Sequence, residues 1–384
     1  MGTGAIDYPD SVTHHTWERV LMSQFAVLRN IQPQPELVRE NIKKAPGFGQ
    51  YFTDHMAHVR YTIEEGWQAH QVKPYAPLQL DPAAAVFHYA QEIFEGLKAY
   101  RHADGSIWTF RPERNAARIN RSAARLALPQ LPEEDFIGSL KALVEVDQQW
   151  VPTPESVADE SSLYLRPFMI ASERFLGVRA SHEVDYYVIS CPVGPYFSGG
   201  IKPVSIWLSE TLKRAGQGGT GFAKCGGNYA ASLVAQNEAA AKGCQQVLFT
   251  DAKEGRYVDE LGGMNLMLVT KDGQLITPQL SDSILDGVTR RSLLDLAPSL
   301  GLDPVERDIS IEEWREGAAS GDIVEAFACG TAAVITPIGR IVADGFTIDH
   351  GEEPGEKTME LRTTLLDIQY GRAEDTNDWL VRLA

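Results

Sequence analysis

The stretch Gly-Gly-Thr-Gly-Phe-Ala-Lys-Cys-Gly-Gly-Asn-Tyr-Ala-Ala, residues 218–231, places a single amine among five glycines. Because glycine has no side chain, its backbone can adopt positive φ and approach a ligand closely. A lysine at the protein surface needs no such backbone. An enclosed amine can lose its proton and attack a carbonyl carbon to form a Schiff base. Lys224 is therefore the candidate catalytic residue. From this stretch alone, a glycine-rich surface turn with a solvated lysine is the open alternative.

Nucleotide-binding loops fit this stretch poorly. A phosphate-binding P-loop ends in Gly-Lys-Ser or Gly-Lys-Thr, whereas Ala223 precedes Lys224 and Cys225 follows it. The dinucleotide pattern G-x-G-x-x-G is also missing around Gly219. Neither of these cofactor classes is supported.

Length and charge restrict the possible partners. At 384 residues, with 43% hydrophobic and 9% aromatic residues, the chain is long enough for two domains with packed cores. The formal net charge of −17 repels nucleic acids and anionic lipids, and no run of lysines or arginines offsets it. We expect no nucleic-acid or membrane partner, so any anionic ligand must be bound by locally placed arginines.

The four cysteines, Cys191, Cys225, Cys244 and Cys329, form no C-x-x-C pair. This spacing argues against a disulfide framework and against a zinc site, so no metal is expected. The N-terminus lacks the pattern of a secretion signal, and no apolar run approaches the ~20 residues of a membrane span. A cytoplasmic location is the expectation.

Pro192, Gly194, Pro195, Gly199 and Gly200 mark the clearest domain boundary, because turn formers this dense continue neither strand nor helix. We predict an N-terminal arm over 1–47, a small α+β domain over 48–198, an interdomain linker over 199–212 and a large strand-rich domain over 213–384. The fold class is mixed α+β.

Hydrophobic periodicity predicts the elements of both domains. Helices are expected at 111–126, 133–150, 228–242, 288–300 and 310–319, and the segment 84–100 as a short helix returning to a strand. Strands are expected at 52–61, 67–72, 163–171, 184–191, 204–208, 247–250, 266–269 and 275–276, with a last strand at 323–327.

A lysine that forms a Schiff base implies a carbonyl cofactor or substrate. Pyridoxal phosphate further needs a carboxylate at its pyridine nitrogen, a hydroxyl near its ring oxygen and a phosphate site. Glu260 follows a strand at a glycine turn and could point into a cleft, or it is a plain loop acid. Tyr229, five residues past Lys224, starts a helix and could reach the cofactor, or it is a half-buried core tyrosine.

Candidate phosphate ligands lie at a helix start, in a small-residue turn and on a basic helix. Asp286-Gly287-Val288-Thr289 opens a helix whose free N–H groups attract anions, although Asp286 could simply cap it. Gly330-Thr331-Ala332 follows a strand and adds a hydroxyl. Arg118 shares its helix with four further arginines, and one of the five need only turn inward from an otherwise solvated face.

Five motifs in order resemble one family. They are Phe-Glu-Gly-Leu-Lys-Ala (94–99), Ser-Leu-Tyr-Leu-Arg-Pro (162–167), Lys-Cys-Gly-Gly-Asn-Tyr (224–229), Glu-Leu-Gly-Gly-Met-Asn (260–265) and Gly-Thr-Ala (330–332). From about Phe48 to the C-terminus the chain resembles the branched-chain amino acid aminotransferases, two-domain pyridoxal phosphate enzymes of fold type IV. The resemblance implies amino transfer between leucine, isoleucine or valine and 2-oxoglutarate, by a ping-pong mechanism.

The resemblance also implies roles at the cofactor. Lys224 would form the Schiff base with it and later move the proton between the substrate Cα and the cofactor. Glu260 would pair with the pyridine nitrogen, and Tyr229 would hydrogen-bond the ring oxygen. The phosphate would be held by Arg118, Val288, Thr289 and Thr331, with Arg214 nearby.

For the substrate, the resemblance implies an aromatic box of Phe48, Tyr89, Phe94, Tyr164 and Tyr196. Tyr164, Arg166 and the turn Thr331-Ala332 would receive the carboxylate, and Arg166 could also meet the γ-carboxylate of glutamate. The loop 175–178, with Leu176 and Val178, would come from the partner subunit of a homodimer. The small-molecule substrates would be leucine, isoleucine, valine, glutamate and their 2-oxo acids.

The sequence differs from the animal relatives of this family at two places, and three alternative functions are weighed against the one it implies. Ala333 and Thr336 stand where animal relatives have a C-x-x-C pair, and Gly262 stands where those relatives have a threonine. A D-amino acid aminotransferase or aminodeoxychorismate lyase of the same fold is the first rival, and a non-catalytic binding module the second. An NAD-dependent oxidoreductase, the third, lacks its glycine motif. A role in synthesis and a role in breakdown both remain open.

Overall fold

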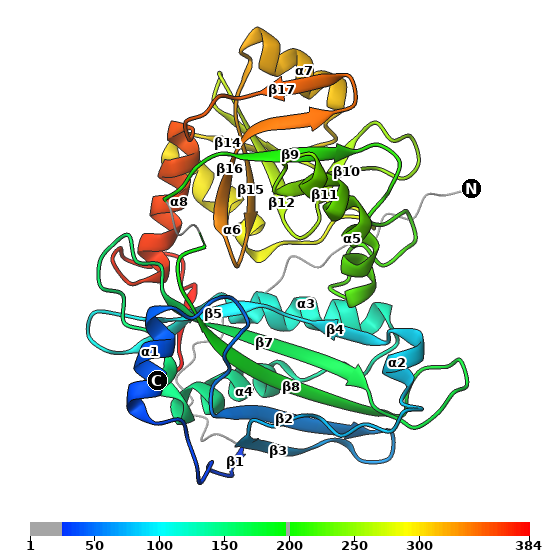
Figure 1. Ribbon diagram of the computed structural model, residues 1–384, viewed down its shortest axis with the longest axis vertical. Coiled ribbons are helices and arrows are strands. Elements are labelled where there is room, and N and C mark those ends of the chain that lie inside the picture. The colour runs from blue at the N-terminus through cyan, green and yellow to red at the C-terminus, as the bar shows by residue number, and fades with distance from the viewer. Residues whose placement is uncertain (1–24, 197–199) are drawn as a thin grey trace.

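The computed structural model describes residues 25–196 and 200–384, which form two sheet-based bodies, one above the other in Figure 1. Each body contains a nine-stranded sheet within the described residues. Helices α3 (Pro112–Arg125) and α5 (Gly226–Ala241) lie near the junction of the two bodies (Figure 1). No helix of the described residues is long and apolar enough to cross a membrane.

The first sheet has the strand order β1-β3-β2-β8-β7-β5-β6-β18, and β4 pairs with β7 beside this path. Antiparallel pairing of β7 with β8 runs from Ser162 opposite Val193 to Ala171 opposite Val184. Helices α3 and α4 pack into one core with this sheet, which buries Ile119, Phe136 and Trp150 completely. The strands are β1 (Ala26–Val27), β2 (His55–Thr62), β3 (Gly66–Pro74), β4 (Glu92–Phe94), β5 (Leu97–Arg101), β6 (Ile107–Phe110), β7 (Ser162–Ala171), β8 (Glu183–Val193) and β18 (Leu380–Arg382), and the remaining helices are α1 (Glu36–Lys44), α2 (Ala85–Tyr89), α4 (Glu133–Val146) and η1 (Gln148–Trp150).

The second sheet has the order β11-β10-β9-β16-β15-β12-β13-β14, with β17 paired to β16. Helix α5 packs against β9 and β10, while α6 and α8 pack against β15. Its strands are β9 (Val204–Ser209), β10 (Gln246–Thr250), β11 (Val258–Leu261), β12 (Asn265–Thr270), β13 (Gln274–Thr277), β14 (Asp303–Glu306), β15 (Ile323–Gly330), β16 (Val334–Ala343) and β17 (Phe346–Asp349), and its helices are α6 (Val288–Leu296), η2 (Ala297–Leu300), α7 (Ile311–Ser320) and α8 (Glu356–Gln369).

Sheet topology differs from the expected domain boundaries at both ends of the large domain. Strand β9 lies inside the expected linker 199–212, yet it pairs with β10 and β16 in the second sheet because its apolar residues Ile206 and Leu208 are buried there. At the other end, β18 leaves the large domain and pairs with β6 of the first sheet. Leu383, directly after β18, is fully buried in the first core and anchors the end of the chain there. Residues 197–199 of the expected boundary lie outside the described residues.

The expected N-terminal arm contains elements that the sequence pattern did not reveal. Of residues 1–47, those before Phe25 lie outside the described part. Phe25 is buried in the first core, β1 adds to the edge of β3, and α1 carries no buried residue. Helix α1 therefore lies over the fold as expected, whereas Phe25 is a core residue.

The expected last strand, 323–327, is followed by three more strands, β16, β17 and β18, and by helix α8. Strand β16 pairs with β15 and β9, so it lies in the middle of the second sheet. Pro337 and Gly339 interrupt its apolar sequence, which hides a strand from a pattern search. The long helix 133–150 also divides, because α4 ends at Val146 and a 3₁₀ turn continues to Trp150.

Candidate active site

Lys224 lies in the segment between β9 and α5, and both of its backbone polar groups are held by the first body. Its N–H donates to Ser122 Oγ at 2.9 Å, and its carbonyl accepts from the Phe94 N–H at 2.9 Å. Its Nζ donates to the Tyr229 hydroxyl at 2.7 Å and lies 4.8 Å from the centre of the Phe94 ring. Tyr229, expected to contact the cofactor ring, therefore lies within hydrogen-bond distance of the Lys224 amine.

Two of the glycines beside Lys224 allow close packing of the chain on itself. A side chain at Gly221 would collide with the backbone of Ser283 and Asp282. One at Gly226 would collide with the Glu92 carboxylate, which accepts the Gly226 N–H. Glu92 therefore satisfies the first N–H of α5, two residues from Lys224, and burial raises its pKa. The sequence analysis assigned no role to Glu92.

A series of side-chain contacts connects Lys224 with the exposed Phe48. The Phe94 ring lies 5.0 Å from the Tyr229 ring and 4.7 Å from the Arg166 guanidinium. Arg166 Nη2 donates to the Tyr164 hydroxyl at 2.9 Å, and the Phe48 ring packs edge-on to Tyr164 at 5.1 Å. A side chain at Gly96 would strike that hydroxyl, so this motif glycine makes room for Tyr164.

Glu260 is a buried strand residue rather than a loop acid. It lies in β11 and is 2% exposed. Its Oε1 lies 2.8 Å from Arg214 Nη1 and accepts from the Leu285 N–H at 3.1 Å, and its Oε2 accepts from Asn265 Nδ2 at 3.0 Å. Burial raises the pKa of Glu260 to about 7, against the opposing effect of Arg214. The expected turn position is wrong, because the glycine turn starts only after β11.

Arg214 lies beside the Glu260 carboxylate. Besides Glu260, its Nη1 donates to the carbonyls of Ser283 at 2.9 Å and Gly221 at 3.2 Å. Its buried Nε has no partner among the described residues. The sequence analysis set Arg214 near the phosphate, but these contacts lie around Glu260.

The expected anion site combines a helix start with the turn after β15. Helix α6 begins after Gly287 with no side-chain cap, so the N–H groups of Val288 and Thr289 are available to a ligand. Asp286, the possible cap, instead pairs with Arg121 at 2.9 Å. Val288, Thr289 and Thr331 line one small cavity of about 20 Å³.

Arg118 is buried and turns inward, toward the segment just before α6. Its Nη1 donates to the Asp286 carbonyl at 3.0 Å, directly before α6. Its Nε and Nη2 each donate at 2.8 Å to the carboxylate of Glu95, which is fully buried. Burial opposes both charges, but the pair lowers the pKa of Glu95 and raises that of Arg118. Glu95 was missed as a site residue, although it lies in the quoted motif 94–99.

Five expected substrate residues, Phe48 among them, remain at the surface of the single chain. Tyr89 is 40% exposed, Leu176 58%, Val178 86% and Tyr196 47%. The Tyr89 hydroxyl donates to the Leu176 carbonyl, so Tyr89 groups with the loop 175–178. The described chain therefore brings Phe48, Phe94 and Tyr164 together but does not close the expected box.

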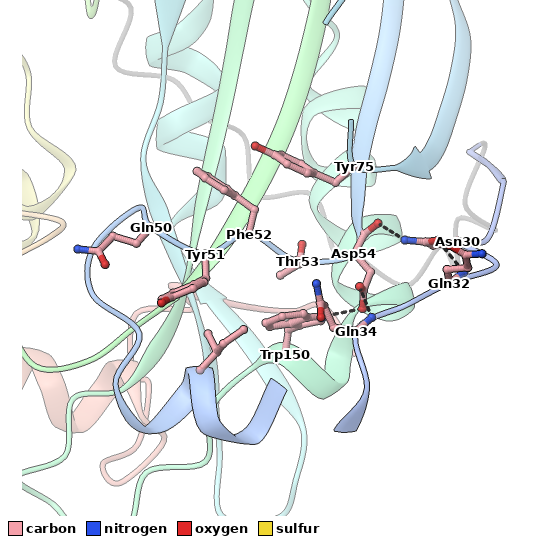
Figure 2. Close-up of a pocket in the computed structure, with 11 residues that line it drawn as sticks. Asn30, Gln32, Gln34, Gln50, Tyr51, Phe52, Thr53, Asp54, Tyr75 and Trp150 are labelled. Carbon is pink, nitrogen blue, oxygen red and sulfur yellow. Dashed lines mark hydrogen bonds between the residues drawn. The ribbon is translucent and has the colours of Figure 1, made fainter. Parts of the chain in front are cut away.

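The more spacious recess of the protein lies elsewhere. A cavity of about 280 Å³ between α1, the start of β2 and Trp150 contains none of the expected site residues (Figure 2). Its buried Asp54 accepts from Trp150 Nε1 at 2.7 Å and from the Gln34 N–H at 2.8 Å. These bonds fasten the N-terminal segment to the first body.

Two α+β bodies that bring together a lysine amine, a buried carboxylate and an uncapped helix start define an enzyme class that works through an aldehyde cofactor. A family model described as amino-transferase class IV matches residues 92–341. The branched-chain-amino-acid aminotransferase of Mycolicibacterium smegmatis is 57% identical over 94% of this chain and 98% of its own length. That of Mycobacterium tuberculosis is 53% identical over the same shares.

Solved structures agree with these relatives. The Escherichia coli branched-chain amino acid aminotransferase superposes with a TM-score of 0.69 at 24% identity, covering 85% of this chain and 100% of that one. A second branched-chain amino acid aminotransferase, solved with pyridoxamine 5'-phosphate, gives a TM-score of 0.69 at 25% identity, over 85% of this chain and 99% of that one. The chain belongs to the branched-chain-amino-acid aminotransferase family of class IV transaminases. The expected fold type IV architecture, transaminase activity and pyridoxal phosphate cofactor are thereby confirmed.

The residues of this chain fit that cofactor. Glu260 is a buried anion whose position is fixed by three donors, as a pyridinium partner must be. The uncapped start of α6 and Thr331 line one small cavity, which brings candidate donors for a phosphate group together. Lys224 precedes both of these sites in the chain, and its amine donates to the Tyr229 hydroxyl.

Proposed function

We propose that this transaminase transfers amino groups between leucine, isoleucine or valine and 2-oxoglutarate in two alternating half-reactions. One observation carries the proposal: Lys224 Nζ and the Arg166 guanidinium both lie within 5 Å of the Phe94 ring, at 4.8 and 4.7 Å. A reacting amine and a candidate receptor for carboxylate thus contact the same aromatic ring.

Each cofactor residue has one task in this proposal. Bound pyridoxal phosphate supplies an aldehyde for the Lys224 amine and a ring that takes up electrons from the substrate α-carbon. Lys224 Nζ carries the proton to and from that carbon, and the Tyr229 hydroxyl positions Nζ. Glu260 keeps the ring nitrogen protonated. Val288, Thr289 and Thr331 bind the phosphate, with Arg118 fixing the chain just before α6.

The substrate side requires an aromatic wall and a carboxylate receptor. Phe48, Phe94 and Tyr164 present uncharged surface to a branched aliphatic side chain. Arg166 has a buried Nε without a partner among the described residues, and its Nη2 reaches only a neutral hydroxyl. We assign this guanidinium, which lies close enough to Glu92 to act on the pKa of that carboxyl, to the γ-carboxylate of glutamate. The turn Thr331-Ala332 with Tyr164 is assigned to the α-carboxylate.

The exposed residues Tyr89, Leu176 and Val178 are assigned to the site of a partner subunit in a homodimer. They are tied together by the Tyr89–Leu176 hydrogen bond, and exposed apolar side chains of this kind mark an interface. Tyr196, next to the undescribed residues, remains a proposed member of the box. The cytoplasm remains the proposed location.

Substrate kinetics test the proposal. One methylene in an apolar pocket is worth roughly 1–3 kcal/mol, so leucine should exceed alanine by about a hundredfold in kcat/KM. Aspartate should fail, because its carboxylate is too short to reach Arg166. Parallel double-reciprocal plots for leucine and 2-oxoglutarate would show the alternating half-reactions. Equal kcat/KM for leucine and alanine would refute the pocket assignment.

Mixed dimers test the partner assignment. The Lys224→Ala protein and a Leu176→Asp/Val178→Asp protein should each be nearly inactive. If the loop serves the partner's site, a hybrid of the two contains one intact site and should regain about half the activity per site. If the loop serves its own subunit, the hybrid contains no intact site and stays inactive. Each variant mixed with itself is the control.

A further inference from the structure

Lys98 is a buried lysine for which the proposed reaction has no use. It lies in β5 within the motif 94–99 and is 5% exposed. Its Nζ donates to the Ala332 carbonyl at 2.9 Å, a bond that crosses from the first body to the turn between β15 and β16 of the second. Thr109 Oγ1 in turn donates to the Lys98 carbonyl at 2.9 Å, which steadies the strand beneath it.

Within the described part of the chain, no ion pair joins a carboxylate to Lys98. The charged groups that face it are Glu160 and Arg362, and these two pair with each other at 2.7 Å. Burial lowers the pKa of Lys98 to about 8, Glu160 opposes this change and Arg362 adds to it. Because the folded pKa lies below the value of 10.5 for a free lysine, protonated Lys98 destabilises the fold below about pH 8, and this penalty fades toward pH 10.5. A methionine would pack here without that penalty.

The turn that Lys98 holds is strained. Val334, the first residue of β16, has a φ of +59°, which β-branched residues rarely adopt. Such backbone persists only where the surroundings enforce it, and it concentrates at ligand sites. Lys98 also lines the small cavity together with Thr289 and Thr331, so its side chain meets the anion-binding end of the site.

We propose that Lys98 is a positioning residue that fixes the Ala332 carbonyl, and with it the turn Thr331-Ala332, so that the turn can receive the α-carboxylate of the amino acid. Its ammonium also adds positive charge behind that carboxylate. The inference rests on the proposed function, since it takes the turn as the α-carboxylate receptor. Lys98 acts through the turn and does not contact the reacting atoms.

Binding of 4-methylvaleric acid tests this proposal without turnover. This acid has the leucine carbon skeleton but no amino group, and its carboxyl stays ionised throughout pH 7–9. In the holoenzyme, Lys98→Met should weaken its binding about tenfold, which is the order expected for one lost charge-assisted hydrogen bond. The KM values of leucine and glutamate should rise by the same factor because they share the α-carboxylate, while kcat changes less than about threefold.

The pH dependence separates positioning by a charge from mere packing. In wild type, the affinity for 4-methylvaleric acid should fall as pH rises through about 8, where Lys98 loses its proton. Lys98→Met should remove that step, and Lys98→Arg should largely restore binding. Lys73→Met is the matched control, because Lys73 is another lysine of the first sheet whose pKa burial lowers, and it contacts His58 instead.

Each outcome decides the proposal. Unchanged affinity and unchanged KM in a folded Lys98→Met protein would reduce Lys98 to a structural residue. If that variant does not fold, the wild-type titration still decides, and affinity that stays flat from pH 7 to 9 overturns the role of the charge. Failure of the wild-type enzyme to bind the acid or to transaminate leucine would instead refute the proposed function itself.

Discussion

The cofactor half of the site, around Glu260 and Arg118, is buried within one chain, whereas the substrate half, around Phe48 and the loop 175–178, is exposed. Glu95, Glu260, Arg118 and Arg214 are all no more than 5% exposed. By contrast, Phe48 is 53% exposed and Val178 is 86% exposed. One chain by itself therefore supplies the residues of the cofactor half, whereas part of the substrate specificity must come from a second surface.

The two halves are also held by different forces. Buried ion pairs, Arg118 with Glu95 and Arg214 with Glu260, fix the cofactor half. Removing one member of a buried pair leaves an uncompensated charge and typically costs about 3–5 kcal/mol. Ring packing and a single hydroxyl contact hold Arg166 and Phe48 in the substrate half. Substitutions in the first half should therefore reduce every reaction, and those in the second should change substrate preference.

Lys224→Ala should have the largest effect and would break the cofactor half outright. Without the amine no group transfers the α-proton, so turnover of leucine and of glutamate should both fall by at least about 10⁴-fold. The fold should remain, because the ion pairs of this half do not involve Lys224. Single-turnover assays and thermal unfolding measure the two effects. Turnover near the wild-type rate would disprove the assignment.

Glu260→Gln sharpens the comparison by removing the charge but keeping the shape. Loss of one such electrostatic contact typically costs on the order of 10²–10³ in rate, and the loss should be equal for leucine and glutamate. Asp259→Asn is the comparison variant, because Arg214 pairs directly with Glu260 but acts on Asp259 through its charge, so the loss of rate should be smaller. A kcat unchanged from wild type would leave Glu260 a structural acid of β11.

The sequence could predict the cofactor half well, because its key residues lie in short motifs. Lys224, Tyr229 and the helix start at Val288 are each recognisable from local spacing. Glu95 was not predicted as a site residue, because its role depends on the inward turn of Arg118, which lies 23 residues away. Asn265 was likewise not predicted, since only the fold brings its amide to Glu260.

The substrate half was harder to predict. The family resemblance implied that Tyr89 and Phe94 share one box, but the Tyr89 hydroxyl donates to the carbonyl of Leu176 in the loop 175–178. Local spacing does not reveal which surface an exposed ring will meet. The strand β16, which contains Pro337, and the pairing of β18 with the first sheet were missed for a related reason. Strand β16 pairs with β9 and β18 pairs with β6, and both partners lie far away along the chain.

Arg166→Met tests the substrate half with the smallest and most selective effect. Glutamate should lose its γ-carboxylate receptor, so its kcat/KM should fall roughly 10–100-fold, as for a charge-assisted hydrogen bond of about 1.5–3 kcal/mol. Leucine has no such group, and methionine keeps apolar contact with the Phe94 ring, so leucine should change less than about threefold.

The control for this prediction is Arg60→Met, which removes an arginine of the same sheet that only forms a surface pair with Glu183. That variant should leave both substrates unchanged, because exposed pairs contribute little. If Arg166→Met reduced leucine and glutamate equally, Arg166 would bind the α-carboxylate that the two substrates share. The substrate half would then resemble the cofactor half in acting on every substrate, and discrimination between leucine and glutamate would have to come from the exposed rings and the partner's loop.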